Sequence, residues 1–166
     1  PVHGQEVGRV RRLAGIRQCL EEHGLPEDHL EILSTSRKEF AKYPGDRAEY
    51  QNGYDRTIEA LQNGTVSTAF IGNNDMTALG IMDAIAELGY KIPYDYSVCG
   101  FDNIPLASMK QISLTTIEHA TVQKGHEAVD LIHKKHSQDH SGRQPSYTVR
   151  LEYEPQLIVR NSTGKC

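Results

Sequence analysis

Two short polar runs hold most of the side chains that could bind a small molecule. The first run is 72–75, with the sequence Gly-Asn-Asn-Asp, and the second is 100–103, with the sequence Gly-Phe-Asp-Asn. In each run a glycine allows a sharp backbone turn and a close approach to a ligand. Asparagine supplies both hydrogen-bond donors and acceptors, and an aspartate accepts hydrogens from two hydroxyl groups. These groups suit a sugar or another polyol, whose ring carries both donors and acceptors.

Each of these side chains also has a purely structural interpretation. Asp75 begins a predicted helix and is most simply its N-cap, and Asn74 is either a cap or a ligand contact. Asp102 either binds a ligand or shapes an Asx turn with the residues that follow it. Arg12 has a rigid fork of donors that can grip two ligand oxygens, or it is one of several solvated arginines on its helix. The spacing alone leaves these alternatives open.

The chain that must position these residues alternates between helical and strand patterns. The predicted helices are 5–22, 50–62, 75–88 and 121–136; the predicted strands are 30–33, 65–71, 96–101, 112–117, 149–153 and 156–159, with a loop at 34–46. Strands separated by helices predict right-handed crossovers and a parallel sheet covered by helices on both faces. Ligands of such sheets bind beyond the carboxyl ends of the strands, which is where the two polar runs fall.

The composition is that of an ordinary globular chain and argues against several classes of function. Apolar residues make up 37% and charged residues 24%. The net charge of −4 gives no basic surface for nucleic acid, so any DNA contact is expected on a part of the protein outside this chain. Three widely spaced cysteines favour a reducing compartment over a disulfide framework or a zinc site. No apolar run reaches the roughly 18 residues of a membrane span.

Motifs of the familiar enzyme classes are absent from the sequence. It contains no P-loop, no dinucleotide-binding glycine motif and no nucleophile elbow, and no acid–base pair stands out. His136 and His140 are spaced so that they could share a helix face around a metal ion, but they run into a polar tail and are interpreted as a solvated helix end. The sequence therefore predicts a binding protein with no enzymatic activity, no cofactor and no metal.

Six segments form a distinctive series in chain order. They are RLAG at 12–15, GNNDMTALG at 72–80, LGYKIP at 88–93, YSVCGFD at 96–102, LTTI at 114–117 and LIVRNSTG at 157–164. Together they resemble the effector-binding region of the LacI/GalR family of bacterial transcription regulators. The resemblance implies a periplasmic-binding-protein-like fold of type I, a three-layer α/β sandwich around a parallel sheet.

The resemblance also implies how the chain is divided. Residues 1–111 correspond to the C-terminal effector-binding subdomain, and 112–136 correspond to a return segment of the N-terminal subdomain. Residues 137–166 then supply the closing strands of the C-terminal subdomain. The DNA-binding head of the family is expected outside this chain.

Individual residues acquire roles through the same resemblance. Arg12, Asn74 and Asp102 match positions that contact the effector in the family. Thr121 matches another position that lines the pocket, and Tyr50 lies near the position where the family often has an aromatic side chain that stacks on the ligand. The predicted effector is a sugar or a related small polar molecule.

A second predicted surface lies on the apolar helix that follows the first polar run. Its interpretation is either core packing or, as the resemblance implies, part of a two-fold dimer interface. The residues assigned to that interface are Leu79, Met82, Ile104 and Met109.

These features predict the effector-sensing fragment of a LacI-type transcriptional regulator, usually a repressor, that works as a cytoplasmic homodimer. Operator DNA is expected to bind through the head outside this chain. The alternative is a sugar-binding protein of a transport system, and a weaker one is a fragment of a hydrolase or kinase. The LTTI segment and the Arg-Asn-Ser-Thr-Gly sequence at 160–164 favour the regulator.

Overall fold

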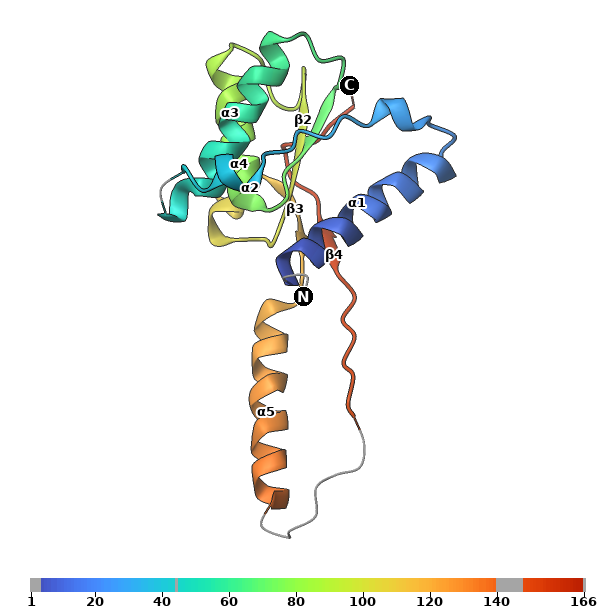
Figure 1. Ribbon diagram of the computed structural model, residues 1–166, viewed down its shortest axis with the longest axis vertical. Helices are drawn as coiled ribbons and strands as arrows, with labels where there is room; N and C mark the ends of the chain where they lie inside the picture. The colour runs from blue at the N-terminus through green and yellow to red at the C-terminus, as the bar shows by residue number, and fades with distance from the viewer. Residues whose placement is uncertain (1–3, 44, 140–147, 166) are drawn as a thin grey trace.

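The computed structural model describes residues 4–43, 45–139 and 148–165. Figure 1 shows an α/β body, from which one long helix and a returning segment project as an arm. His140, which was weighed with His136 as a metal ligand, lies outside the described residues. The helices are α1 (Gly4–Glu22), α2 (Arg37–Phe40), α3 (Ala48–Gln62), α4 (Asp75–Glu87) and α5 (Thr121–Asp139), the 3-10 turns are Glu27–His29, Gly45–Arg47 and Pro105–Ser108, and the strands are β1 (Ala69–Ile71), β2 (Ser97–Phe101), β3 (Thr115–Glu118) and β4 (Gln156–Ile158).

The sheet has the strand order β1-β2-β3-β4. The first three strands are parallel, as the alternation of helices and strands predicts, with Ile71 opposite Cys99 and Cys99 opposite Thr115. β4 runs antiparallel to β3, with Ile117 opposite Leu157, which differs from the all-parallel prediction. The reason is the path of the chain, which leaves β3 through α5 and returns beside β3 in the opposite direction (Figure 1).

The core lies between the sheet and α4. Ile85, Val98 and Leu114 are fully buried, and Ile81 and Phe70 are nearly so. Each such side chain stabilises the fold by about 1.5–3 kcal/mol relative to its exposed state. α3 packs against α4 as a second layer on the same side of the sheet.

The crossing of α3 and α4 depends on glycine. A Cβ on Gly80 would lie 2.0 Å from the backbone oxygen of Tyr50, and one on Gly53 would lie 2.3 Å from the backbone oxygen of Thr77. No side chain fits at either distance, so these two glycines allow the helices to approach backbone to backbone. The close packing fixes α3 relative to the first turn of α4, where the first polar run is found.

The opposite face of the sheet is covered less completely. Ile71, which alternates with the buried Phe70, is 51% exposed. α1 reaches this side mainly through Arg12, whose guanidinium carbon lies 4.4 Å from the centre of the Phe101 ring. Among the described residues, the face of the sheet opposite α3 and α4 is therefore only thinly covered by helix.

Two predicted strands are absent from the described sheet, and two others, 65–71 and 112–117, are shorter than expected. Residues 30–33 and 149–153 have no regular hydrogen-bonded partner strand, and their apolar side chains are largely exposed. The predicted strand 65–71 is limited to Ala69–Ile71. An apolar run makes a strand only where a neighbouring strand pairs with it. The predicted loop 34–46 also contains α2, which begins with a capping box between Ser36 and Glu39.

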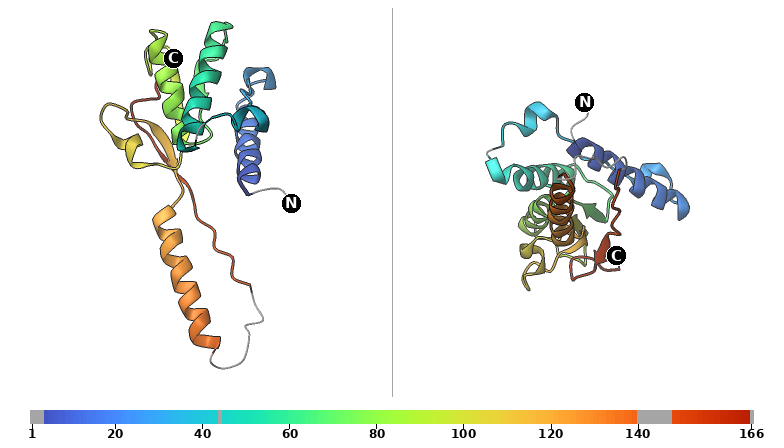
Figure 2. Two further views of the ribbon diagram at one scale, coloured as in Figure 1. Left: turned by 60° about the vertical axis from the view of Figure 1, so that its left-hand side comes forward. Right: turned by 90° about the horizontal axis from the view of Figure 1, so that it is seen from below.

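α5 carries an apolar face that the body does not cover. Val122, Val129 and Ile132 share one side of the helix and are 88%, 65% and 69% exposed. The left view of Figure 2 shows from a second direction that α5 points away from the body. The returning segment is held to α5 by Tyr153, whose hydroxyl group donates to Glu127 at 2.7 Å. Within the described ranges, no helix is both long enough and apolar enough to cross a membrane.

Candidate functional site

The two polar runs meet at one edge of the sheet, where β1 and β2 end side by side. The glycines of these runs pack against α4, and the approach of a ligand to them stays a prediction. A Cβ on Gly72 would lie 2.6 Å from the backbone nitrogen of Ala78, and one on Gly100 would lie 2.3 Å from Asp75 Oδ1. Because both glycines face α4, the helix sits close to the strands and its first turn lies beside the end of β2.

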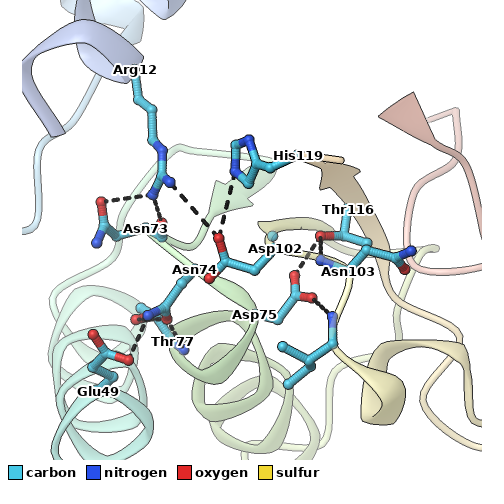
Figure 3. A network of polar contacts seen from close by, with 12 residues as sticks. Arg12, Glu49, Asn73, Asn74, Asp75, Thr77, Asp102, Asn103, Thr116 and His119 are labelled. Carbon is cyan, nitrogen blue, oxygen red and sulfur yellow. Dashed lines mark hydrogen bonds and ion pairs between the residues drawn. The ribbon is translucent and has the colours of Figure 1, made fainter. Parts of the chain in front are cut away.

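Arg12 of α1 joins the two runs, as Figure 3 shows. Its Nη1 donates to the backbone oxygen of Asn73, and Asn73 Oδ1 lies 3.5 Å from the same nitrogen. Its Nη2 lies 3.8 Å from Asp102 Oδ1, and its guanidinium covers the ring of Phe101. Arg12 and Asp102, which are 90 residues apart in the sequence, are thus brought together as predicted.

Asp102 stands at the centre of the group. Its carboxylate is 42% exposed, and the same Oδ1 that faces Arg12 also lies 3.5 Å from His119 Nε2 (Figure 3). Burial raises the pKa of Asp102 above its ordinary value, and the Arg12 guanidinium, with a smaller contribution from His119, opposes this rise only in part. The carboxylate is therefore a partly desolvated acceptor that still reaches solvent.

His119 is a site residue that sequence reasoning missed. It follows β3 directly, so it lies at the same edge of the sheet as the ends of β1 and β2. Its ring stacks on Phe101, with a centroid separation of 6.1 Å and an angle of 14° between the planes. Among the described residues its buried Nε2 has no hydrogen bond of good geometry. The edge rule that singled out residues 72–75 and 100–103 applies equally to the end of β3 and would have found it.

Asn74 is the N-cap of α4. Its Oδ1 accepts hydrogen bonds from the backbone nitrogen and the hydroxyl group of Thr77, each at 2.9 Å, and its Nδ2 donates to Glu49. Asn74 points toward α3 and lies beside Asn73 in Figure 3. One of its two amide hydrogens is used by Glu49, which leaves the group able to donate once more.

Asp75 is not the N-cap that its place in the sequence suggested. Its side chain is fully buried; Oδ2 accepts the backbone N–H of Ile104 at 2.8 Å, and Oδ1 accepts the hydroxyl group of Thr116. Burial raises the pKa of Asp75, against the lowering effect of these two hydrogen bonds. Asp75 thus connects α4 to β3 and to the loop after β2.

The structure does not bring Tyr50 into this group. Its hydroxyl group donates to Asp83, which raises the pKa of Tyr50 to about 12. Asp83 is nine residues beyond Asn74 on the same helix, a distance of about 13 Å along the axis. The neighbouring Glu49, which sequence reasoning did not select, reaches Asn74 instead.

Thr121 lies at the start of α5, close in sequence to His119. It is exposed, and its backbone nitrogen is 3.5 Å from Glu118 Oε1. With Glu118, Val122 and Gln123 it lines a shallow, open depression at the base of the arm. Arg12, Asp102 and His119 do not line this depression, so the role predicted for Thr121 in the pocket stays a prediction.

The four residues predicted at a dimer interface divide into two pairs. Met82 and Ile104 are partly buried and pack against the core. Leu79 is half-buried on α4, and Met109 is 50% exposed after the Pro105–Ser108 turn. Core packing thus accounts for much of the first pair, and the second pair lies nearer the surface.

Comparison with known proteins identifies the family. Residues 2–163 match the family described as a periplasmic binding protein-like domain, and the chain belongs to this family. It is 29% identical over 161 residues to the HTH-type transcriptional regulator DegA of Bacillus subtilis, which covers 97% of this chain and 43% of DegA. The chain spans less than half the length of the curated relatives it matches.

Solved structures give the same result. A LacI-family transcriptional regulatory protein from Corynebacterium glutamicum superposes with a TM-score of 0.67 at 31% identity, covering 93% of this chain and 53% of that one. A LacI family regulator from Enterococcus faecium with bound ribose superposes with a TM-score of 0.70 at 27% identity, covering 92% and 50%. The predicted resemblance to LacI-type regulators and the predicted α/β class are confirmed, and these relatives are regulators rather than enzymes.

Proposed function

We propose that this chain is the effector-sensing part of a LacI-type transcriptional repressor, and that its effector binds at the edge formed by Arg12, Asp102 and His119. The observation that carries the proposal is the meeting of Arg12 with Asp102. A cation from α1 and a half-exposed carboxylate after β2 stand within 4 Å of each other at the ends of parallel strands. Polar ligands of open α/β sheets bind at this place.

The chemistry of the edge favours a small polyol, such as a sugar, as the effector. Arg12 offers a planar fork of donors, and Asp102 accepts hydroxyl hydrogens. His119 Nε2 adds a ring nitrogen next to Asp102, and Asn74 adds an amide hydrogen. A ligand hydroxyl pair that bridges Arg12 and Asp102 would replace their long mutual contact of 3.8 Å with two shorter hydrogen bonds.

We assign the exposed arm to a second subdomain that completes the effector cleft. The sequence placed the crossing to the other subdomain at residue 112, but β3 (Thr115–Glu118) pairs with β2 in the sheet of the body, so we place the crossing after β3. In this division the body forms one wall, and α5 with the segment that returns to β4 enters the other subdomain. The apolar face of α5, with Val129 and Ile132 more than 60% exposed, supports the assignment because a stable helix buries such a face. Thr121, at the base of the arm, would then line the cleft between the two subdomains.

The same proposal covers the partners of the longer protein. Its operator DNA would be bound by a head outside this chain, since the net charge of −4 does not suit a DNA surface. Two copies would associate through α4 and the segment after Pro105–Ser108, with Leu79 and Met109 at the contact. Such a regulator works in the cytoplasm. The effector shifts it between two states only through its different affinity for each.

A thermal-shift screen tests the proposed function. The longer protein with both subdomains is heated with pentoses, hexoses and their phosphates, and a ligand of the native state raises the unfolding temperature by mass action. Asp102→Ala is expected to abolish the shift given by any hit, because it removes the central acceptor. Asp28→Ala, an exposed aspartate in the Glu27–His29 turn, is the matched control and should keep the shift. A shift that survives Asp102→Ala contradicts the assignment of the site.

A further inference from the structure

The loop that carries Asp102 has an unusual backbone. Asp102 and the next residue, Asn103, have φ values of 109° and 49°, so two successive residues other than glycine lie at positive φ. This region is costly for residues with a side chain, and it persists where the surrounding contacts determine it. The orientation of the Asp102 carboxylate depends on those contacts.

The backbone of the loop is held from β3 and α4. The N–H groups of Asp102, Asn103 and Ile104 each have a partner, in that order the backbone oxygen of Ile117, the hydroxyl oxygen of Thr116 and Asp75 Oδ2. The Thr116 hydroxyl group in turn donates to Asp75 (Figure 3). Three consecutive amides are thus directed at partners in two other elements.

The side chain of Asn103 uses both ends of its amide. Its Oδ1 accepts from Arg160 Nη2 at 2.7 Å, and its Nδ2 donates to Glu118 Oε2 at 2.9 Å. Arg160 is itself fixed, because its Nη1 donates to the backbone oxygen of Leu114 at 2.7 Å. Asn103 is therefore clamped between the segment after β4 and the end of β3.

We propose that Asn103, clamped between Arg160 and Glu118, is a positioning residue that holds the Asp102 carboxylate between Arg12 and His119. Asn103 does not touch the ligand in this proposal. Its clamp prevents the loop from relaxing to negative φ, which would turn Asp102 away from α1. The inference rests on the proposed function of Asp102. It also gives the segment after β4 a role in the effector site, because Arg160 of that segment holds Asn103.

The test is a pH titration of the Asp102 carboxyl group, in which NMR monitors the chemical shift of the carboxyl carbon. It is carried out on the wild-type chain and on Asn103→Gly. Glycine adopts positive φ without strain, so this variant removes the two side-chain hydrogen bonds and leaves the backbone geometry accessible. The groups around Asp102 are Arg12 of α1, His119 after β3, Glu49 of α3 and Asp75 of α4. Burial is the largest cause of its raised pKa, so release into solvent should move the midpoint down toward the ordinary value.

Ala120→Gly is the matched control. Ala120 also has positive φ, at 54°, and lies near the same edge, so glycine there adds backbone freedom without removing a side-chain hydrogen bond. The Asp102 midpoint should not change in this variant. An unchanged midpoint in Asn103→Gly, with an otherwise native amide spectrum, overturns the proposal.

A second pair of variants keeps the test decisive if Asn103→Gly does not fold. Glu118→Ala removes one side of the clamp at the end of β3, and Glu118→Gln keeps an acceptor oxygen for Asn103 Nδ2. The alanine variant should lower the Asp102 midpoint and the glutamine variant should leave it in place; equal midpoints in the two overturn the proposal. No ligand is used in these measurements, so their failure is separate from a failure of the sugar screen.

Discussion

Apolar side chains are buried in the core of the body of this molecule and exposed in its arm. In the body, Val98 and Leu114 are fully buried against α4, whereas in the arm Val129 and Ile132 are 65% and 69% exposed. Both regions have apolar residues at the spacing of their secondary structure. The difference is the presence of a packing partner within the described residues, and it supports the proposal that the arm packs against a second subdomain. The proposed effector site lies where the two regions join.

The largest expected effect is in the core of the body. Leu114→Ala should lower the free energy of unfolding by about 2–5 kcal/mol, because it leaves a cavity in a fully buried position. Leu157→Ala, on the 61% exposed position of β4, is the control and should change it by much less. Urea unfolding followed by circular dichroism measures both. An equal decrease in the free energy of unfolding in both variants would show that Leu157 is packed as tightly as Leu114. That result would contradict the difference between buried and exposed apolar positions.

A smaller effect is expected from the buried carboxyl group that links the body to the site. Because the fold raises the pKa of Asp75, the contribution of this residue to stability is fully present below its ordinary pKa of 3.8. That contribution is lost as the pH rises through the raised pKa of the folded state. Asn does not ionise in this range, so the stability advantage of the wild type over Asp75→Asn should shrink as the pH rises across that window.

Urea unfolding of both proteins at a series of pH values checks the sign. Groups such as Asp102 and Glu118 titrate in both proteins, so the difference between the two curves isolates Asp75. A wild-type advantage that grows with pH would mean that the carboxylate form is the one stabilised by Thr116 and Ile104.

The smallest effect is expected on the arm. Ile132→Ser should change the stability of this chain by no more than about 0.5 kcal/mol, because the side chain is already exposed. In the longer protein with the second subdomain, the same substitution should cost about 1–3 kcal/mol, since a hydroxyl group is then buried in an apolar contact. Lys134→Ser, another exposed α5 position, is the control in both proteins. A neutral result in the longer protein contradicts the assignment of the arm.

The sequence was sufficient to predict the elements whose partners are near in the chain. α3, α4 and β2 lie within two residues of their predicted ends, because periodicity and turn residues mark them. The segments 30–33 and 149–153 were wrongly predicted as strands, since pairing depends on a neighbour that the local sequence does not contain. The direction of β4 likewise depends on the path of the arm.

In the candidate site, too, some features could be predicted from the sequence and others depend on residues that are distant in the chain. The family resemblance assigned Arg12 and Asp102 to the same site, whereas the rule that strand ends gather at one edge places Asp102 but not Arg12, which lies on α1. The cap of α4 was not, because Asn and Asp cap helices about equally well, and the choice between Asn74 and Asp75 depends on which one the sheet buries. Asn103 was not selected because its role comes from Arg160, 57 residues away.

An NMR titration of this chain with the sugars that stabilise the longer protein tests directly whether the effector binds at Arg12, Asp102 and His119. This method detects the weak binding expected when only one wall of the cleft is present. We expect chemical-shift changes to gather at Arg12, Asn74, Asp102 and His119, and to disappear in Asp102→Ala. Changes centred elsewhere, such as the face of α3 and α4 around Tyr50 and Asp83, would contradict this expectation.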